Sequence, residues 1–329
     1  MNFLVRRPWD LSQNRHTPQD IYQNRKQHRR DFLKTLGIAG AGLCTAGISG
    51  CGKPTAEELD AAGKVEEIPV AATGIFPAKR NTEFDYGRPE TEKFEAALYT
   101  NFYEFSTSKD SWKYVSKFKP NPWEIEVGGL CNQPTKFDLD DLYQKFPHEE
   151  RAYRFRCVEA WAMCVPWTGF PLRELLKAVE PKSSATHVEF ETFERPAEAP
   201  GFNDFPDFPW PYREGLTLEE ASNELTFLAT GIYGEALPKQ HGAPVRLVTP
   251  WKYGFKSCKS IVKITLTDKA PATFWNTYNP REYGFEANVD PDVPHPRWSQ
   301  RQERMLGTGE RYETVKFNGY ESYVAALYA

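Results

Sequence analysis

The sequence around one cysteine is dense in apolar residues and has an arginine directly before the cysteine. It reads Arg-Cys-Val-Glu-Ala-Trp at residues 156–161 and Val-Pro-Trp-Thr-Gly-Phe-Pro-Leu at residues 165–172. We expect such a segment to be buried, and burial raises the pKa of a thiol, whereas a neighbouring cation or a bound metal lowers it. Cys157 is therefore either an inert core cysteine, which is common for this residue type, or a thiolate ligand of a metal.

The composition indicates a strand- and loop-rich globular chain. Of its 329 residues 40% are hydrophobic, enough for a sizeable core, and 26 Pro and 22 Gly accompany 22 Phe, 16 Tyr and 9 Trp. This mixture favours short strands, turns and loops over a helical bundle. The sequence shows no repeat, no low-complexity tract and no second composition regime. Although the length would allow two small domains, one α+β domain is the simplest interpretation.

Charge is distributed unevenly along the chain. The formal net charge is −4, but residues 1–50 hold eight Lys or Arg against three Asp or Glu, a local +5 that leaves −9 for the remainder. A body with this balance gives no indication of a nucleic-acid partner.

The basic N-terminal region is similar to a twin-arginine export signal. Arg29 and Arg30 precede Asp-Phe-Leu-Lys and a Gly-, Ala- and Leu-rich run that ends at Ile48, although His28 stands where serine or threonine is commoner. An ordinary amphipathic helix and a membrane span are the alternatives. A span needs about 20 consecutive apolar residues, more than this glycine-rich run offers.

These signals divide the chain into three parts. We expect an export signal, recognised by the twin-arginine translocase, at residues 1–50, a small polar linker at residues 51–65 and the mature domain at residues 66–329. Because this route carries folded proteins to the periplasm, a cofactor would be inserted before export. Ile-Ser-Gly-Cys at residues 48–51 also resembles a lipoprotein cleavage box, which leaves a lipid anchor at Cys51 open.

Four cysteines lie in the expected mature domain, and none of them forms a Cys-x-x-Cys pair: they are Cys131, Cys157, Cys164 and Cys258. The spacing therefore indicates neither a zinc site, nor a thioredoxin-like site, nor covalent attachment of c-type haem. A redox cofactor would have to be held in another way.

Hydrophobic periodicity predicts several elements of the domain. Residues 122–129 and 187–193 alternate apolar and polar side chains, the pattern of half-buried strands. Residues 137–146, with Asp138 before the first leucine, favour a short capped helix, and residues 169–179 carry leucines at helical spacing.

A second informative cluster holds five potential cations within nineteen residues: His241, Arg246, Lys252, Lys256 and Lys259. A solvated basic face is the usual explanation of such a run. However, Pro-Val-Arg-Leu-Val-Thr-Pro at residues 244–250 is a buried-strand pattern that places Arg246 near the interior. A buried guanidinium needs an anion, so the cluster also fits a phosphate site.

The cysteine segment closely resembles that of the catalytic subunits of periplasmic methionine sulfoxide reductases, a family of the sulfite oxidase-fold molybdoenzymes. In that family the cysteine is the protein's sulfur ligand to molybdenum, which also carries the dithiolene of a molybdopterin. The resemblance implies that Cys157 is the metal ligand. Softness supports this, because thiolates match sulfur-loving metals and one protein ligand leaves coordination positions open.

Asn-Phe-Tyr-Glu-Phe at residues 101–105 would by itself indicate only an edge strand. The family has Asn-Asn-Phe-Tyr-Glu-Phe here, contributing pterin contacts and a glutamate beside the metal. The resemblance therefore implies cofactor contacts from Asn101, Tyr103 and Glu104. Thr100 replaces the first asparagine, and a hydroxyl offers one donor where the amide offers two.

The resemblance extends over residues 66–329 and implies a single mixed domain of the sulfite oxidase molybdopterin-binding fold. It includes Tyr-Gly-Phe at residues 283–285 and His-Pro-Arg-Trp-Ser-Gln at residues 295–300. His241 stands where the family often has asparagine. The implied cofactor is molybdopterin without an attached nucleotide, and the further contacts implied are Thr192, His241, Arg246, Ser257, Cys258 and Lys259.

The residues after the cysteine bear on the substrate. Sulfite-oxidising relatives typically have arginines there, whereas this chain has Val158, Glu159, Ala160 and Trp161. A glutamate in place of arginine would repel a dianion in a poorly solvated pocket. A neutral sulfoxide fits better, and we expect Trp161, Trp167 and Trp251 to wall its pocket.

We therefore predict a molybdenum-dependent reductase of methionine sulfoxide, free and protein-bound, that repairs oxidised periplasmic proteins. Cys157 and Glu104 are the expected catalytic residues, with Glu104 relaying protons. The sequence has no haem or iron–sulfur motif, and the resemblance implies a haem-bearing membrane subunit as electron donor. The alternatives are an oxidoreductase of sulfite or another small S- or N-oxide on the same fold, and a metal-free binding protein.

Overall fold

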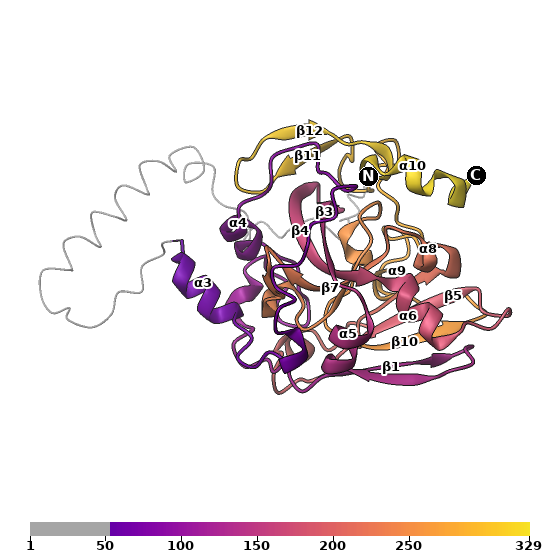
Figure 1. The fold of residues 1–329 in the computed structure, drawn as a ribbon. Coiled ribbons are helices and arrows are strands. Elements are labelled where there is room, and N and C mark those ends of the chain that lie inside the picture. The colour runs from indigo at the N-terminus through magenta and orange to yellow at the C-terminus, as the bar shows by residue number, and fades with distance from the viewer. Residues whose placement is uncertain (1–52) are drawn as a thin grey trace, which may run out of the picture. The chain divides into compact units, whose positions relative to one another are not determined.

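The computed structural model describes residues 53–329, and residues from Pro54 to Ala329 form one compact unit. The expected export signal and Cys51 lie outside the described residues. Within residues 53–329, every helix is too short or too polar to cross a membrane. The unit is built around two β-sheets with short helices at their margins (Figure 1).

The first sheet has five strands in the order β2-β1-β10-β5-β6. Strands β1 and β10 are parallel and the other pairs are antiparallel. Alternate residues of β1 and β5 are buried, so the strands predicted at residues 122–129 and 187–193 are confirmed. The bounds are β1 Glu124–Gly129, β2 Thr135–Asp138, β5 His187–Thr192, β6 Arg213–Thr217 and β10 Ile261–Thr267.

The second sheet has the order β12-β11-β4-β7-β8, with β3 paired to β4 and β9 paired to β7. All eleven residues of β4 are buried, because the strand has neighbours on both edges and is covered on both faces. The bounds are β3 Glu149–Arg156, β4 Trp161–Pro171, β7 Phe227–Ile232, β8 Glu235–Ala236, β9 Arg246–Val248, β11 Gln302–Met305 and β12 Arg311–Glu313.

The helices of the described part are short. The predicted capped helix is α5, where the side chain of Asp138 accepts the amide of Asp141, and α6 buries its row of leucines, as predicted. The α-helices are α3 Ala56–Gly63, α4 Lys93–Leu98, α5 Leu139–Lys145, α6 Leu172–Val179, α7 Gly201–Asp204, α8 Leu218–Ser222, α9 Phe274–Tyr278 and α10 Glu321–Val324. The 3₁₀ turns are η2 Val70–Ala72, η3 Ser111–Lys113, η4 Lys239–His241, η5 Gly254–Lys256, η6 Lys316–Gly319 and η7 Ala325–Tyr328.

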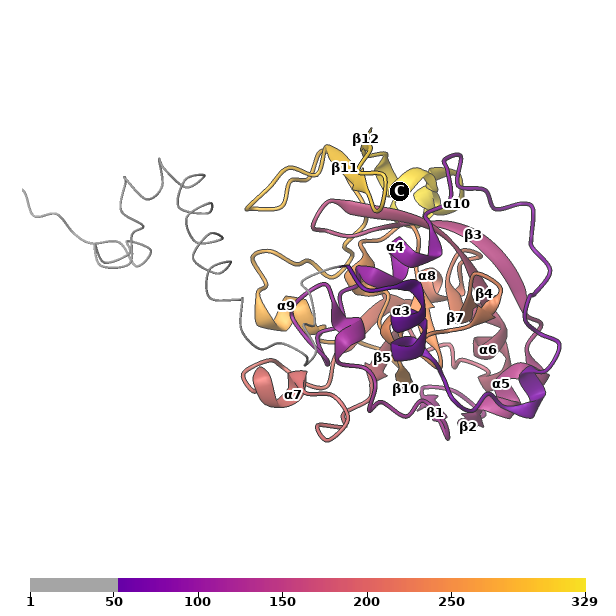
Figure 2. The ribbon, with the colours of Figure 1, turned by 90° about the vertical axis from the view of Figure 1, so that its left-hand side faces the viewer.

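The segment expected to be a linker, residues 51–65, instead contains helix α3. Thr55 accepts the amide of Glu58, and the carboxylate of Glu58 accepts the amide of Thr55, which is a capping box. Leu59 is 1% exposed, so the helix packs against the unit. Its neighbour is α4, beside which it lies (Figure 2). The composition of the segment did not indicate this helix, because a capping box and one buried leucine stabilise it and its overall hydrophobicity is low.

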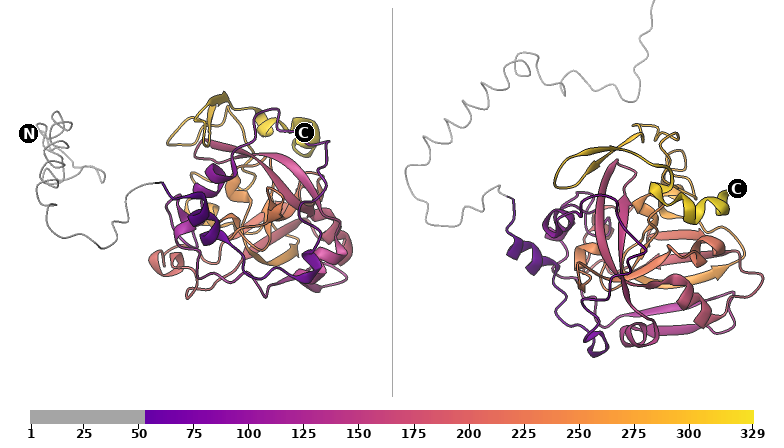
Figure 3. Two further views of the ribbon diagram at one scale, coloured as in Figure 1. Left: turned by 60° about the vertical axis from the view of Figure 1, so that its left-hand side comes forward. Right: turned by 45° about the horizontal axis from the view of Figure 1, so that its top comes forward.

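Two arrangements matter for function. The C-terminal strands β11 and β12 lie against the long β3–β4 hairpin, whose turn carries Cys157 (Figure 3). The residues 101–105 form turns, with one bridge between Phe102 and Ser106, rather than the edge strand that their sequence alone suggested. The mixed α+β class predicted from the sequence is confirmed.

Candidate functional site

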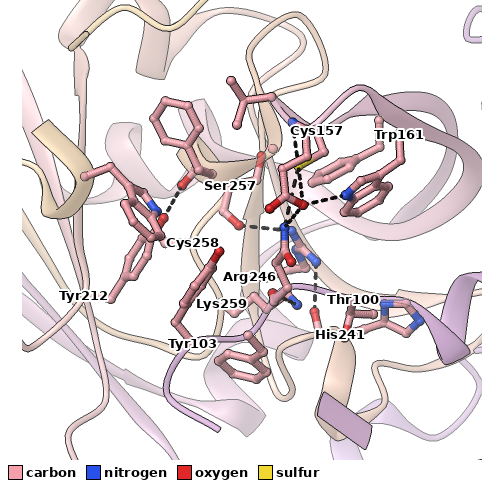
Figure 4. A pocket seen from close by; sticks show the side chains of 18 of the residues that line it. Thr100, Tyr103, Cys157, Trp161, Tyr212, His241, Arg246, Ser257, Cys258 and Lys259 are labelled. Carbon is pink, nitrogen blue, oxygen red and sulfur yellow. Dashed lines mark hydrogen bonds between the residues drawn. The ribbon is translucent and has the colours of Figure 1, made fainter. Parts of the chain in front are cut away.

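One pocket collects almost all the residues singled out in the sequence. It holds about 770 Å³ of empty space, including its open mouth. Residues from several separate parts of the chain converge on it (Figure 4). Of the predicted site residues, nine line it: Asn101, Tyr103, Glu104, Cys157, His241, Arg246, Ser257, Cys258 and Lys259. Thr192 does not line it.

Cys157 lies where β3 ends and the chain reverses into β4. The amide of Cys157 donates to Trp161 O at 2.9 Å, and the amide of Ala160 donates to Cys157 O at 3.0 Å, with Ala160 at φ 67°. The sulfur accepts the amide of Glu159 at 3.4 Å and the Asn101 side chain at 3.6 Å. Burial, together with the charge of Glu159, raises the pKa of the thiol to about 12. A bound metal would oppose this rise and favour the thiolate.

Glu159 is a site residue that the sequence reasoning used only as an argument against sulfite. Its Oε2 lies 3.8 Å from the sulfur of Cys157 and accepts Trp161 Nε1 at 3.1 Å and Asn101 Nδ2 at 3.3 Å. Lys109 pairs with the carboxylate at 2.7 Å. Burial would raise the pKa of Glu159, but the hydrogen bonds and the Lys109 charge lower it. The sequence feature that could have identified Glu159 as a site residue is its position two residues after the cysteine, across a tight turn.

Glu104 is buried in the wall of the pocket, with 3% of its surface exposed. Burial raises the pKa of its carboxyl group to about 7, although the hydroxyl of Thr192, which donates to Oε1 at 2.9 Å, works against the rise. The structure thus places the Thr192 hydroxyl on Glu104 instead of in the pocket. A carboxylic acid that titrates near neutrality can give or take a proton there.

Arg246 is 2% exposed and is held by neutral partners. It donates to the carbonyls of His241 and Ser257 at 3.0 Å each, and its guanidinium lies 4.8 Å from the ring centre of Trp167. Burial lowers the pKa of Arg246 to about 9. Lys259 likewise donates to the carbonyls of Asn101 and Gln240. Within residues 53–329 neither cation forms an ion pair with a carboxylate.

Two buried polar atoms of the pocket residues have no hydrogen-bond partner in the described part of the chain. They are Nδ1 of His241 and Oδ1 of Asn101. Burial and the charges of Lys259 and Arg246 hold the pKa of His241 well below its ordinary value. A buried group without a partner is costly, so the amide oxygen of Asn101, an acceptor, suits a ligand with N–H or O–H donors, whereas the cations Arg246 and Lys259 suit an anion. The pterin and phosphate of a molybdopterin would offer both, with the Cys157 sulfur available for its metal.

The aromatic residues that line the pocket differ from the three tryptophans predicted from the sequence. Trp161 lines the pocket, but Trp167 and Trp251 are wholly buried behind it, and Trp251 donates its ring N–H to Tyr328. Both face the core of the second sheet, a distinction that an apolar local sequence does not reveal. The aromatic residues that line the pocket are Phe102, Tyr103, Phe155, Trp161, Tyr212, Phe255, Trp275 and Tyr283.

Thr100, which stands where the family has an asparagine, forms its side-chain hydrogen bond within the protein. Its hydroxyl is 2.5 Å from that of the buried Ser111, so the two hydroxyl groups form a hydrogen bond with each other. Cys131, Cys164 and Cys258 are free and buried, as is Cys157, and of these four only Cys157 and Cys258 line the pocket.

Known proteins resemble the chain in sequence. The model of the oxidoreductase molybdopterin binding domain matches residues 112–275. The protein-methionine-sulfoxide reductase catalytic subunit MsrP of Burkholderia mallei (strain ATCC 23344) is 44% identical over 324 residues, covering 97% of this chain and 93% of its own. That of Xanthomonas axonopodis pv. citri (strain 306) is 44% identical over 320 residues, covering 95% and 93%. The sulfane dehydrogenase SoxCD from Paracoccus pantotrophus aligns with a TM-score of 0.46 and 15% identity over 80% of this chain, which spans 62% of that one.

Proposed function

We propose that this chain, which belongs to the family of protein-methionine-sulfoxide reductase catalytic subunits, reduces methionine sulfoxide, free and within oxidised proteins, at a molybdenum–molybdopterin cofactor. The observation that carries the proposal is the pocket itself. A buried thiol and two cations without carboxylate partners line the same cavity, which is the donor set that a metal bound to an anionic pterin requires.

Each part of the cofactor has candidate contacts in the pocket. Cys157 would hold the metal, and the cations Arg246 and Lys259 the pterin phosphate. The remaining predicted contacts are Asn101, Tyr103, Glu104, Thr192, His241, Ser257 and Cys258, of which Thr192 would act through Glu104. When bound, the cofactor supplies oxygen-atom transfer with a change of metal oxidation state.

The pocket favours a neutral substrate over a dianion. Beside the cysteine lies the carboxylate of Glu159, and the nearest arginine in sequence, Arg156, is turned into the core toward Glu303. Sulfite would meet this negative charge, whereas a sulfoxide would not. The rings of Tyr103, Trp275 and Tyr283 offer the apolar and sulfur–aromatic contacts that suit a thioether side chain.

The reaction consumes protons, because a sulfoxide, two electrons and two protons give a thioether and water. Glu104 is a carboxylic acid in the pocket wall whose pKa of about 7 allows it to hold a proton at neutral pH. We assign it the role of proton donor to the departing oxygen. Thr192, which donates to its Oε1, orients the carboxyl group.

Partners and location follow from family membership. We propose a periplasmic enzyme, exported folded by the twin-arginine translocase, that repairs oxidised periplasmic proteins with electrons from a haem-bearing membrane subunit. The pterin would carry no nucleotide. Mass spectrometry of the mature amino terminus decides whether Cys51 is lipidated, since an unmodified start beyond it excludes the anchor.

Two measurements test the function. Elemental analysis of the purified protein should give one molybdenum per chain. Steady-state assays should show turnover of free and protein-bound methionine sulfoxide with a reduced electron donor, and no turnover of sulfite with an electron acceptor. Sulfite turnover with inert sulfoxide would favour the sulfite oxidoreductase alternative, and a metal-free protein would favour a binding function.

A further inference from the structure

We propose that the C-terminal segment, residues 298–304, together with Arg156, sets the position of the Cys157 sulfur by holding the backbone of the cysteine loop, residues 157–160, from the side away from the pocket. These are positioning residues, and their role rests on the proposed metal site.

The carbonyl of Val158 receives two side-chain donors from this segment. Trp298 Nε1 donates to it at 2.7 Å and Gln300 Nε2 donates to it at 2.8 Å. Gln300 is 1% exposed, so its bond is shielded from water. A carbonyl that accepts two N–H groups, from side chains 140 and 142 residues away in the sequence, is fixed in direction at both of its lone pairs.

The carbonyl of Cys157 is bound by the buried guanidinium of Arg156. Arg156 is oriented in turn by Glu303 Oε2 at 3.0 Å and by Gln300 Oε1 at 2.9 Å. Glu303 also pairs with Arg88, and the side chains of Arg156 and Glu303 are 0% and 1% exposed. Gln300 therefore links the hydrogen bonds at the two carbonyls. Its side-chain nitrogen donates to the carbonyl of Val158, and its side-chain oxygen accepts from Arg156.

The far end of the loop is tied to the same segment through the backbone. The amide of Arg304 donates to Ala160 O at 2.9 Å, and Arg304 is in register with Trp161 where β11 pairs with β4. Ala160 adopts a positive φ of 67°, a conformation that a non-glycine residue keeps only when its surroundings impose it. Three of the four loop carbonyls are thus bound to Arg156 or to the C-terminal segment.

The contacts of the sulfur itself are long: the amide of Glu159 at 3.4 Å, Asn101 Nδ2 at 3.6 Å and Glu159 Oε2 at 3.8 Å. Its position is consequently set by the backbone that carries it. Groups that orient a metal ligand from behind typically change metal affinity roughly 10- to 100-fold when they are removed. We expect the same class of effect here from residues that never touch the cofactor.

The test uses the holoenzyme and two substitutions that remove hydrogen bonds: W298F, which also shortens the side chain by one ring, and Q300M, which keeps its length. W210F is the matched control, because Trp210 Nε1 also donates to a backbone carbonyl, that of Phe205, and does not line the pocket. For each folded protein, the rate of molybdenum loss to a chelator and the electron paramagnetic resonance spectrum of the one-electron-reduced metal are measured.

We expect W298F and Q300M to lose molybdenum roughly tenfold faster than the parent and to shift the resonance spectrum, while W210F matches the parent in both. The proposal would be overturned if W298F lost molybdenum at the parental rate and kept the parental spectrum. This outcome would be decisive even if Q300M did not fold. Neither readout needs a substrate. A shifted spectrum in a protein that does not reduce methionine sulfoxide would therefore refute the proposed function and leave the positioning role standing.

Discussion

Arg156 and Arg246 are both buried, and they differ in what surrounds the charge. Arg156 ends strand β3 and is paired with Glu303, which it meets at 3.0 Å. Arg246 begins strand β9, its hydrogen-bond acceptors within residues 53–329 are backbone carbonyls, and an aromatic ring lies beside its guanidinium. One guanidinium is neutralised within the fold, and the other lines a pocket with its charge unmatched by any carboxylate of residues 53–329.

The difference teaches how to separate structural from functional charges. Burying an ion without a partner costs several kcal/mol, so a fold that does so has either a binding partner for it or a shifted protonation state. The first arginine stabilises the cysteine loop whether or not a ligand is bound. We propose that the second is stabilised by what binds in the pocket, and the following experiments test that contrast.

Replacing the proposed metal ligand should have the largest effect. C157S puts a harder oxygen in place of the sulfur, and we expect it to lose the metal and at least about 100-fold in reductase activity. Elemental analysis and the methionine sulfoxide assay measure this. C164A is the control, because Cys164 is 1% exposed and does not line the pocket. A C157S protein with full metal content would show that the thiol is only a core residue.

Removing the unmatched cation should have the next largest effect. R246M keeps the volume but not the charge, and we expect pterin and molybdenum content to fall roughly tenfold, because the phosphate loses charge-assisted hydrogen bonds. Pterin fluorescence after oxidative release measures the content per chain. R213M, which removes an arginine paired with Glu191 away from the pocket, should keep the parental content. Full occupancy in R246M would contradict the phosphate role.

The two arginines should also differ in stability of the cofactor-free protein. R156M leaves Glu303 with one of its two buried partners and frees Gln300, and we expect it to lower the free energy of unfolding by about 3 kcal/mol or more. R246M should cost only about 1 to 2 kcal/mol, since lost bonds to carbonyls are offset by removal of an unpaired buried charge. Denaturant unfolding compares them, and an equal or larger loss in R246M would end the contrast.

Glu104 is the acidic counterpart of Arg246, buried without an ion pair in the described residues. Its pKa of about 7 exceeds the ordinary 4.5, so the folded protein binds the extra proton between these values. Its contribution to stability is present below pH 4.5, falls as pH rises to about 7 and is constant above. E104Q, which cannot ionise, should therefore be more stable than the parent above pH 7, by at most about 3 kcal/mol.

Thermal unfolding of the cofactor-free proteins at several pH values tests this prediction. The difference between E104Q and the parent should vanish near pH 4 and grow through the neutral range. A difference that does not change with pH would mean that Glu104 ionises at its ordinary pKa. E126Q, at an exposed carboxylate on β1 outside the pocket, serves as the comparison.

Hydrophobic periodicity predicted some strands and helices well and did not reveal two others, β4 and α3. Strands β1 and β5 have one buried face each, so their sequences alternate and could be recognised. Strand β4 is buried at all eleven residues, and a strand covered on both faces has no alternation to detect. Helix α3 was mistaken for a linker because its stabilising features are one capping box and one leucine.

The site was predicted through residue types more than through geometry. Cys157, residues 101–104 and three of the five predicted cations, His241, Arg246 and Lys259, line one pocket. The other two cations form buried ion pairs instead, Lys252 with Glu220 and Lys256 with Glu214. Sequence reasoning missed the ion pair of Glu159 with Lys109, residues separated by 50 positions whose meeting depends on the fold. It also put Trp167 and Trp251 in the pocket wall, where the structure has them in the core.

The sequence alone determined the chemistry available to this protein: a soft sulfur in an apolar segment, a cluster of cations on a buried-strand pattern, and family membership. Such properties belong to individual residues and their close neighbours, so a linear reading contains them. Only the tertiary structure decided which charges are neutralised by ion pairs and which aromatic residues line the pocket. It also decided which distant segment holds the cysteine loop. These depend on pairings across more than a hundred residues, whose energies arise when burial brings the partners into contact.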